Sequence, residues 1–541
     1  MLKLKNYQET TLNILRDFLE NAHLVGSRQS FEQRSRKSTQ RYANYYQPIE
    51  GLENIPYSCL RLPTGGGKTL LAAHSIGVAS DAWLEQDYPL VLWLVPTNAI
   101  REQTLQTLLD PSHSNREILD NAFEGRVRVL DIADFEQLRP HDIANNLCIV
   151  IGTLATLRVD NTEGRRVYAH NENLEPHFSK VAENIPNLER TEEGPNKDKI
   201  KFSFRNILAL VRPLVIIDEA HNATTSLSME VLRRVDPSCI IEFTATPAAN
   251  SNVLHSVSAA ELKSAEMIKL PIILTEHKTW QAAVSSSVDT RKKLAEFVGK
   301  DKDFIRPIVL IQAEDKDEDV PVDVVERYLT EEEKIDRSKI AIATGDQKEL
   351  EGINLLAPDC PIEFVITVQA LKEGWDCPFA YVFCSVAHVH SKKDVEQILG
   401  RVLRMPYAQR RQQEELNRAY AHVSSVSWPR AVAQLHDRLV SMGFDEQEAQ
   451  QFIKPDVGEL FCSAETTQPQ SAIQIKLDSS PNLGLLDDQE RSKVNLQKTN
   501  DGIILSITGE VSKALEEKIV NSVPAKDKAD VTKIIEVHRQ N

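Results

Sequence analysis

Short apolar runs, almost uninterrupted by polar residues, recur between residues 57 and 247, and stretches with helical spacing separate them. The runs are rich in Val, Ile and Leu, and they are LVLWLVP (90–96), VRVLDI (127–132), LCIVIGT (147–153), LVIIDE (214–219) and CIIEFTATP (239–247). Strands without polar alternation are typical of a parallel sheet that helices cover on both faces. The pattern therefore predicts an α/β domain built on a parallel sheet.

A second series of apolar runs begins near residue 305. It consists of IRPIVLIQA, KIAIATG, IEFVITVQA and AYVFCSVA. Between the two series lies EHKTWQAAVSSSVDTRKKLAEFVG, which has helical spacing. We therefore expect two tandem α/β domains, at residues 1–275 and 300–430, joined by a helical linker at residues 276–299.

The pattern changes again after about residue 430. PRAVAQLHDRLVSMGFDEQEAQQFI has helical spacing, whereas SAIQIKL and GIILSIT are typical of strands. We expect residues 431–541 to form a small, partial accessory region of mixed α+β structure.

Two polar segments interrupt the first predicted domain. Residues 27–56 mix Arg and Lys with Tyr42, Tyr45 and Tyr46, which suits a solvated connection better than a platform for stacked bases. Residues 160–201 are charged, and they are expected to form a mobile surface excursion.

Composition is that of an ordinary globular protein, with 541 residues of which 41% are hydrophobic and 26% charged. This length exceeds one hydrophobic core and favours two or three domains. No window approaches the ~18 apolar residues of a membrane span, and the N-terminal MLKLKNYQETTLNIL resembles an amphipathic helix rather than a signal peptide. A cytoplasmic protein with no membrane partner is expected.

Cysteine usage and net charge narrow the class further. The seven cysteines form no C-x-x-C pattern, which argues against a zinc site and a disulfide framework and favours reduced core cysteines. The net charge of −16 disfavours nucleic acid as a partner at first sight. It does not exclude one, because a channel needs only a local basic lining, while the exterior of the protein can be acidic for solubility.

A glycine-rich stretch, RLPTGGGKT (61–69), is the first candidate for chemistry. Leu62 replaces the first glycine of the strict phosphate-loop pattern. The residues that cradle phosphates are nevertheless all present, because backbone N–H groups, a lysine and a Mg²⁺-binding hydroxyl are what such a loop uses. These residues are Gly65, Gly66, Gly67, Lys68 and Thr69. The stretch predicts a nucleotide site.

Two carboxylates end the apolar run in LVIIDEAHN. In P-loop ATPases an acidic residue at such a strand end, facing the phosphate loop, holds Mg²⁺, and its neighbour orients the attacking water. Asp218 suits the metal role and Glu219 the water-activating role.

Cations for the charge that develops in phosphoryl transfer are expected from QILGRVLRMP (397–406). Arg401 and Arg404 are three apart, which predicts one helix face, and Gln397 lies one turn before Arg401. Because these residues belong to the second predicted domain, hydrolysis would require the two domains to close on one nucleotide.

The ordered motifs resemble those of superfamily-two DEAD/DEAH-box helicases and translocases over roughly residues 1–425. They are YQ (7–8), LPTGGGKT (62–69), LVPTNAI (94–100), IGT (151–153), DEAH (218–221), TATP (244–247), VITVQALKEGWDCP (365–378) and QILGRVLR (397–404). LKEGWDCPFAYVF, GRVLRMP and LNRAYAHVSS are most similar to the Res subunit of type III restriction enzymes. The resemblance implies two tandem RecA-like domains, with ATP and Mg²⁺ as cofactors.

The resemblance also implies roles for single residues around the nucleotide. Gln8 is expected to read the adenine edge, and Gly374, Asp376 and Gln397 to lie at the nucleotide site between the domains. His221 is expected to couple hydrolysis to strand binding together with the TATP pair, Thr244 and Thr246.

A nucleic-acid groove is implied on both domains. Its lining is expected to consist of Thr97, Gly152, Thr153, Thr344, Gly345 and Thr367. Contacts of this kind are mostly neutral hydroxyl and amide contacts to phosphate, which is compatible with an acidic protein.

One departure from the Res family concerns its expected C-terminal nuclease. PD (455–456) and QIK (474–476) are the best match, but Gln474 stands where an acid is required, so nuclease activity in this chain is not expected.

The resemblance therefore implies an ATP-dependent DNA helicase or translocase of restriction or phage defence. Its expected partners are double-stranded DNA and a Mod-like methyltransferase or a separate nuclease. An RNA helicase and a nucleotide-gated clamp without processive motion remain alternatives.

Overall fold

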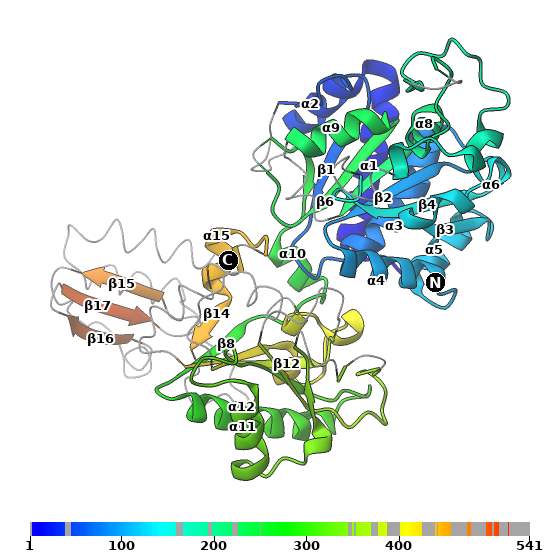
Figure 1. The fold of residues 1–541 in the computed structure, drawn as a ribbon. Coiled ribbons are helices and arrows are strands. Elements are labelled where there is room, and N and C mark those ends of the chain that lie inside the picture. The colour runs from blue at the N-terminus through cyan, green and yellow to red at the C-terminus, as the bar shows by residue number, and fades with distance from the viewer. Residues whose placement is uncertain are drawn as a thin grey trace. The chain divides into compact units, whose positions relative to one another are not determined.

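The computed structural model divides the chain into two compact units, Met1–Gly458 and Glu459–Asn541. Figure 1 shows the fold. The residues described are 3–37, 45–157, 166–192, 197–218, 226–248, 250–344, 349–350, 353–368, 377–386, 401–424, 436, 439–440, 442–455, 473–477, 494–499, 502–507 and 518.

A seven-stranded parallel sheet forms the first part of the larger unit, in the order β3-β4-β2-β5-β6-β1-β7. Its strands are β1 (Tyr57–Arg61), β2 (Leu90–Val95), β3 (Val127–Asp131), β4 (Leu147–Thr153), β5 (Leu214–Asp218), β6 (Cys239–Thr244) and β7 (Val253–Ser256). Every residue of β1, β2, β4, β5 and β6 is buried, as the unbroken apolar runs predict.

The helices that accompany this sheet follow the predicted alternation with the strands. They are α1 (Asn6–Val25), α2 (Ser27–Lys37), α3 (Lys68–Ala79), α4 (Asn98–Leu109), α5 (Ser114–Ala122), α6 (Pro140–Asn145), α8 (Phe204–Val211), α9 (Ser226–Val235) and α10 (Ala259–Ser264). Shorter helical elements are the π-helix η1 (Ser80–Leu84) and the 3-10 helices η2 (Ile132–Gln137) and η3 (Glu172–His177).

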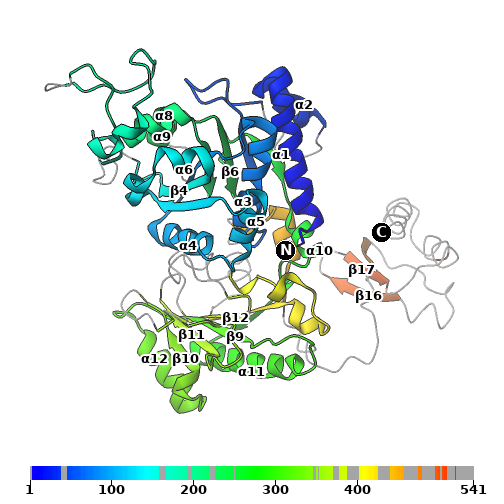
Figure 2. The same cartoon turned by 90° about the vertical axis from the view of Figure 1, so that its right-hand side faces the viewer.

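A second seven-stranded parallel sheet has the order β10-β11-β9-β12-β13-β8-β14. Its strands are β8 (Ile272–His277), β9 (Ile308–Gln312), β10 (Ile340–Ile342), β11 (Phe364–Thr367), β12 (Ala380–Ser385), β13 (Ala419–Ser424) and β14 (Ile453–Pro455). Its helical elements are α11 (Trp280–Val298), α12 (Val322–Arg327), η5 (Tyr328–Glu332), η6 (Arg337–Lys339), η7 (Pro406–Ala408), η8 (Glu414–Asn417) and α15 (Glu446–Gln451). Figure 2 shows α11 and α12 against this sheet.

The predicted fold class is confirmed, because both sheets are parallel and each is accompanied by helices, as two RecA-like domains require. The smaller unit contains the antiparallel sheet β15-β17-β16, with β15 (Ile473–Leu477), β16 (Val494–Thr499) and β17 (Gly502–Ile507). The domain boundaries stay predictions. Two strands bear on them. β8 begins within the range expected for the first domain and β14 lies within the range expected for the accessory region, yet both belong to the second sheet.

The first polar insertion is partly helical and packs on the domain. Phe31 of α2 packs edge-to-face on Phe18 of α1, with ring centroids 6.3 Å apart, and Tyr46 lies 5.6 Å from Phe31. The Tyr46 hydroxyl donates to the Ile55 carbonyl at 2.9 Å, and the ring is buried. Tyr46 is therefore a core residue, whereas Tyr45 is exposed and Tyr42 lies outside the described residues.

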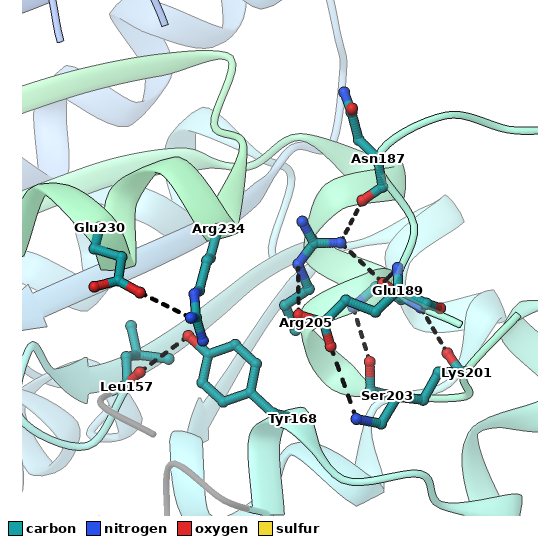
Figure 3. A network of polar contacts seen from close by, with 10 residues as sticks. Leu157, Tyr168, Asn187, Glu189, Lys201, Ser203, Arg205, Glu230 and Arg234 are labelled. Atoms are coloured by element: carbon teal, nitrogen blue, oxygen red, sulfur yellow. Dashed lines mark hydrogen bonds and ion pairs between the residues drawn. The ribbon is translucent and has the colours of Figure 1, made fainter. Parts of the chain in front are cut away.

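The second insertion is attached to the domain by the polar network in Figure 3. The buried Asn206 side chain of α8 bonds three backbone groups of residues 189 and 201 at 2.7 to 2.8 Å. On the other side the Tyr168 hydroxyl donates to the Leu157 carbonyl at 3.0 Å, and the Arg234 guanidinium lies over the Tyr168 ring. The described part of this segment is thus fixed at both of its ends, which the charged sequence did not indicate.

Six cysteines fall within the described ranges; they are free of disulfides, and five of them are buried. Within those same ranges, no helix is long and apolar enough to cross a membrane, and no three or more His, Cys, Asp and Glu side chains gather as a metal site would require.

Candidate nucleotide and nucleic-acid site

The glycine-rich loop runs from the end of β1 to the first turn of α3. Gly65 and Gly67 have φ angles of 87° and 77°, in the left-handed region that favours glycine, and Gly67 caps α3. A Cβ on Gly66 would lie 3.0 Å from the Pro63 carbonyl oxygen. The loop therefore leads directly into the N-terminus of the twelve-residue helix α3. A glycine-rich turn before a helix N-terminus is a favourable site for a bound phosphate.

Two residues of α1 hold this loop from one side. The Tyr7 hydroxyl donates to the Gly66 carbonyl at 2.9 Å. Gln8 accepts a hydrogen bond from the Lys5 N–H at 2.9 Å, and its Nε2 lies 2.9 Å from the position that a Cβ on Gly67 would take. The structure thus brings Gln8, predicted to read adenine, against the phosphate loop. Its buried amide also fixes the start of α1.

Thr69 and Asp218 meet although 149 positions separate them in the chain. The Thr69 hydroxyl lies 3.5 Å from Asp218 Oδ2, and Asp218 is the buried last residue of β5. A hydroxyl and a carboxylate oxygen are hard ligands of the kind that Mg²⁺ prefers. The two side chains that the sequence predicted as metal ligands are therefore adjacent and fit that role. Lys68 is the first residue of α3, whereas Glu219 and His221 lie outside the described residues.

Arg404 is brought to the same loop from far along the chain. It forms an antiparallel bridge with Ile268, and two flanking backbone bonds, from Lys269 N–H to the Leu403 carbonyl and from Met405 N–H to the Met267 carbonyl, extend the pairing. A Cβ on Gly65 would lie 3.1 Å from Ile268 Cγ2 and 4.0 Å from Arg404 Cγ.

This pairing corrects the expectation that Arg401 and Arg404 share a helix face. The helix ends at Val402: Leu403 lies in a turn, Arg404 forms the bridge, and the backbone bonds to residues 267 and 269 flank it. Arg401 is buried and still helical. The other residues predicted at this site, Gly374, Asp376 and Gln397, lie outside the described residues.

The predicted coupling residues Thr244 and Thr246 lie at and just after the end of β6, which pairs with β1, the strand that leads into the glycine-rich loop. Thr244 ends β6 and pairs with Arg61 in the sheet, and its hydroxyl accepts a hydrogen bond from the Thr246 N–H at 3.2 Å. The Leu62 N–H donates to the Thr244 carbonyl at 3.0 Å. The TATP segment and the phosphate loop are thus joined directly through their backbones.

The predicted nucleic-acid residues occupy strand ends and helix starts. Thr97 caps α4, because its hydroxyl accepts from the Ile100 N–H at 3.4 Å. Thr153 exchanges hydrogen bonds with Thr156, and a Cβ on Gly152 would lie 2.9 Å from Ile132 Cδ1.

In the second sheet, Thr344 follows β10, Thr367 ends β11 and Gly345 lies outside the described residues. Thr153 and Thr367 are buried, so in this conformation both hydroxyls face the protein.

Sequence reasoning missed Lys269, whose side chain is fully buried beside the Ile268–Arg404 bridge. Its Nζ donates to the carbonyls of Pro378 and Ala380 at 3.0 and 2.5 Å and lies 3.9 Å from the centroid of the Tyr381 ring. A lone lysine within the apolar MIKLPIIL was the available signal. Lys269 attaches residues 267–270 to the start of β12, directly after the WDCP motif.

Residues 1–249 match the family model described as "Type III restriction enzyme, res subunit". The search of curated protein sequences gave no match.

Two solved structures are similar to the chain. One is the ATP-dependent Type ISP restriction-modification enzyme LlaBIII bound to DNA, at 13% identity and a TM-score of 0.42, covering 84% of this chain and 31% of that one. The other is a fragment of a protein assigned as the HsdR subunit of a type I restriction enzyme from Vibrio vulnificus YJ016. It has 15% identity and a TM-score of 0.37, and the match covers 79% of this chain and 68% of that one.

Proposed function

We propose that the chain is an ATP-dependent DNA translocase or helicase that acts in restriction or phage defence, a proposal supported by the match of residues 1–249 to the Res-subunit model of type III restriction enzymes. The observation that carries the proposal is the meeting of Thr69 with Asp218 beside a glycine loop at a helix N-terminus. These are the parts that a P-loop ATPase needs on its first domain.

Each residue of the site has a part in binding or hydrolysis. The backbone of residues 65–67 and Lys68 bind the phosphates, Gln8 selects adenine, and Thr69 and Asp218 hold Mg²⁺. When bound, Mg²⁺ neutralises negative charge on the phosphate oxygens. Glu219 accepts a proton from the attacking water, while Arg401 and Arg404 stabilise the charge that develops on the transferred group.

We propose double-stranded DNA as the partner that the motor moves along. The contacts with DNA come from residues 97, 152–153, 344–345 and 367. Coupling of these contacts to hydrolysis comes from residues 244 and 246 together with His221. A Mod-like methyltransferase or a separate nuclease supplies modification or cleavage, because Gln474 in β15 leaves the best nuclease-like match in the sequence without its acid. Asp456 of that pattern lies outside the described residues.

The test is ATP hydrolysis by the full chain with duplex DNA, single-stranded DNA and RNA. Stimulation by duplex DNA is expected. Stimulation by RNA alone would overturn the choice of DNA, and tight ATP-dependent binding without turnover would make the protein a nucleotide-gated clamp.

Site variants connect that activity to the proposed residues. Lys68→Ala should abolish hydrolysis, and Glu219→Gln should abolish it while ATP binding persists. Lys302→Ala, which alters an exposed lysine, is the matched control and should hydrolyse ATP as the unaltered chain does. Normal hydrolysis by Glu219→Gln would remove Glu219 from the role of base.

A further inference from the structure

The chain returns to the phosphate loop after it has completed most of the second sheet. We call residues 439–440 and 442–455 the brace. The Thr64 N–H, within the loop, donates to the Met442 carbonyl at 3.1 Å. Arg61, the last residue of β1, donates through Nη2 to the Gly443 carbonyl at 2.5 Å. Two consecutive carbonyls of the brace therefore accept hydrogen bonds from residues on either side of Leu62.

Gly443 also packs against the TATP segment more closely than any other residue type would allow. Its φ is 89°, and a Cβ on it would lie 2.5 Å from the Ala245 carbonyl oxygen and 3.0 Å from the Ala245 Cβ. Those neighbouring atoms are backbone and a methyl group, which cannot rotate away. Only glycine combines this backbone conformation with this contact.

Arg61 is unusual for a strand residue because its charged side chain is buried, in a strand that lies between β6 and β7 of the first sheet. Its Nη1 donates to Ser256 Oγ at 2.9 Å and to the Val257 carbonyl at 3.4 Å, while Nη2 reaches Gly443. A buried guanidinium requires acceptors for its N–H groups, and hydrogen bonds from a charged donor are stronger than neutral ones. The brace thus supplies an acceptor that the charge of Arg61 needs.

The other end of the brace belongs to the second sheet. Its last strand, β14, pairs in parallel with β8 at the edge of that sheet, and the Ile272 N–H donates to the Phe452 carbonyl at 2.8 Å. Phe444 and Phe452 pack edge-to-face with centroids 6.5 Å apart. One short stretch of chain, which contains α15, therefore connects Gly443 at the phosphate loop with β14 at the second sheet.

We infer that Met442 and Gly443 are positioning residues for the nucleotide site, holding the phosphate loop at Thr64 and the TATP segment at Ala245. This inference rests on the proposed ATPase function. A loop whose backbone is already held loses less conformational freedom when it closes around phosphates, so the brace strengthens nucleotide binding. Since one short segment touches the loop, the TATP segment and the second sheet, it also links their positions.

The test compares Gly443→Ala with Gly26→Ala in the full chain. Gly26 has a φ of 84°, but no atom lies within 4 Å of the position that a Cβ on it would take, so Gly26→Ala reproduces the backbone strain without the contact. In Gly443→Ala the new methyl group should push the brace away from Ala245 and break the hydrogen bond from the Thr64 N–H to the Met442 carbonyl. This loss should raise the KM for ATP about three- to tenfold, with a smaller change in kcat. Amide hydrogen exchange of the peptide that contains Thr64 should accelerate in that variant alone.

The outcomes separate the inference from the function on which it rests. If Gly443→Ala matches Gly26→Ala in KM and in exchange at Thr64, the brace has no positioning role. If the unaltered chain neither binds nor hydrolyses ATP, the proposed function fails, while exchange at Thr64 still reports the contact. Should Gly443→Ala not fold, Arg61→Lys loses the bond to Gly443 without steric conflict, and it should show the same KM and exchange changes; unchanged values there would overturn the inference.

Discussion

At the scale of single residues, Arg404 and Glu242 illustrate two different consequences of burial and pairing. Arg404 is held through its backbone by Ile268, so its side chain starts from a fixed point close to Gly65. Glu242, in the middle of β6, is held through its side chain and is fully buried. The first arrangement serves the proposed reaction, whereas the second makes folding sensitive to pH.

Arg404→Ala is expected to lower kcat for ATP hydrolysis by about 10³-fold, because an arginine at the transferred phosphate has an effect of that size. The melting temperature and the affinity for ATP should change little, since the pairing with Ile268 uses the backbone. Arg410→Ala is the control, because Arg410 is an exposed arginine that pairs with Glu414. A loss of only tenfold in Arg404→Ala would place this arginine outside the shell of the γ-phosphate.

Burial raises the pKa of Glu242 to about 7, against the opposing effect of a hydrogen bond from the Tyr57 hydroxyl at 2.8 Å. In the unfolded chain the carboxyl loses its proton near pH 4.5, whereas the folded state keeps it to about pH 7. The folded state therefore binds more protons within this window, and the free energy of unfolding falls as pH rises through it.

Glu242→Gln should remove this pH dependence. The free energy of unfolding of the variant relative to the unaltered chain should rise by about 3 kcal/mol from about pH 4.5 to about pH 7 and stay constant above that. Urea unfolding at a series of pH values measures the difference. Glu50→Gln, at a side chain that is 91% exposed, should follow the unaltered chain. A parallel shift of the two curves at all pH values would show that Glu242 does not titrate in this window.

At the scale of elements, the sequence patterns predicted the buried strands well and the insertions poorly. Unbroken apolar runs predict such strands, because both faces of a sheet that helices cover are buried. The 160–201 insertion gave no such signal, since its attachment depends on the amide of Asn206 and on the aromatic ring of Tyr168, which lies beside Arg234 in Figure 3. Single polar side chains that satisfy backbone groups have no periodicity to detect.

Asn206→Ala should release the second insertion and lower stability by roughly 2 to 3 kcal/mol. The change leaves backbone groups of residues 189 and 201 buried without their partner, and such groups are costly. Limited proteolysis should cut residues 187–201 sooner, and thermal unfolding should shift downward. Asn173→Ala, at an exposed position of the same insertion, should do neither. Equal proteolysis of both variants would show that Asn206 does not hold the segment.

At the scale of the whole molecule, an acidic chain is proposed to move along a polyanion. The net charge of −16 makes long-range attraction to DNA weak, so binding must depend on short contacts from hydroxyl and backbone groups. This differs from proteins that bind DNA through many lysines and arginines, whose affinity falls steeply with salt.

The dependence of DNA affinity on salt tests this proposal. Few charged contacts to phosphate, about three or fewer, should give a slope of log K against log salt no steeper than about −3. Fluorescence anisotropy with labelled duplex DNA between about 50 and 200 mM salt measures the slope, with ATP binding at the same salt concentrations as the control. A slope near −10 would instead require an extended basic lining.

The sequence by itself determined the parallel strands and the glycine-rich loop before α3, and it named Thr69 and Asp218 as the ligands now proposed for Mg²⁺. Local patterns suffice for these, because buried strands need continuous apolar side chains and a phosphate loop needs consecutive glycines before a helix. The tertiary structure decided which distant backbones meet. The bridge between Ile268 and Arg404 ended a helix that residue spacing had extended, and Gly443 met Ala245 across almost 200 positions. Such contacts depend on how the chain closes and on the room left by a missing Cβ, and no local spacing of residues records either.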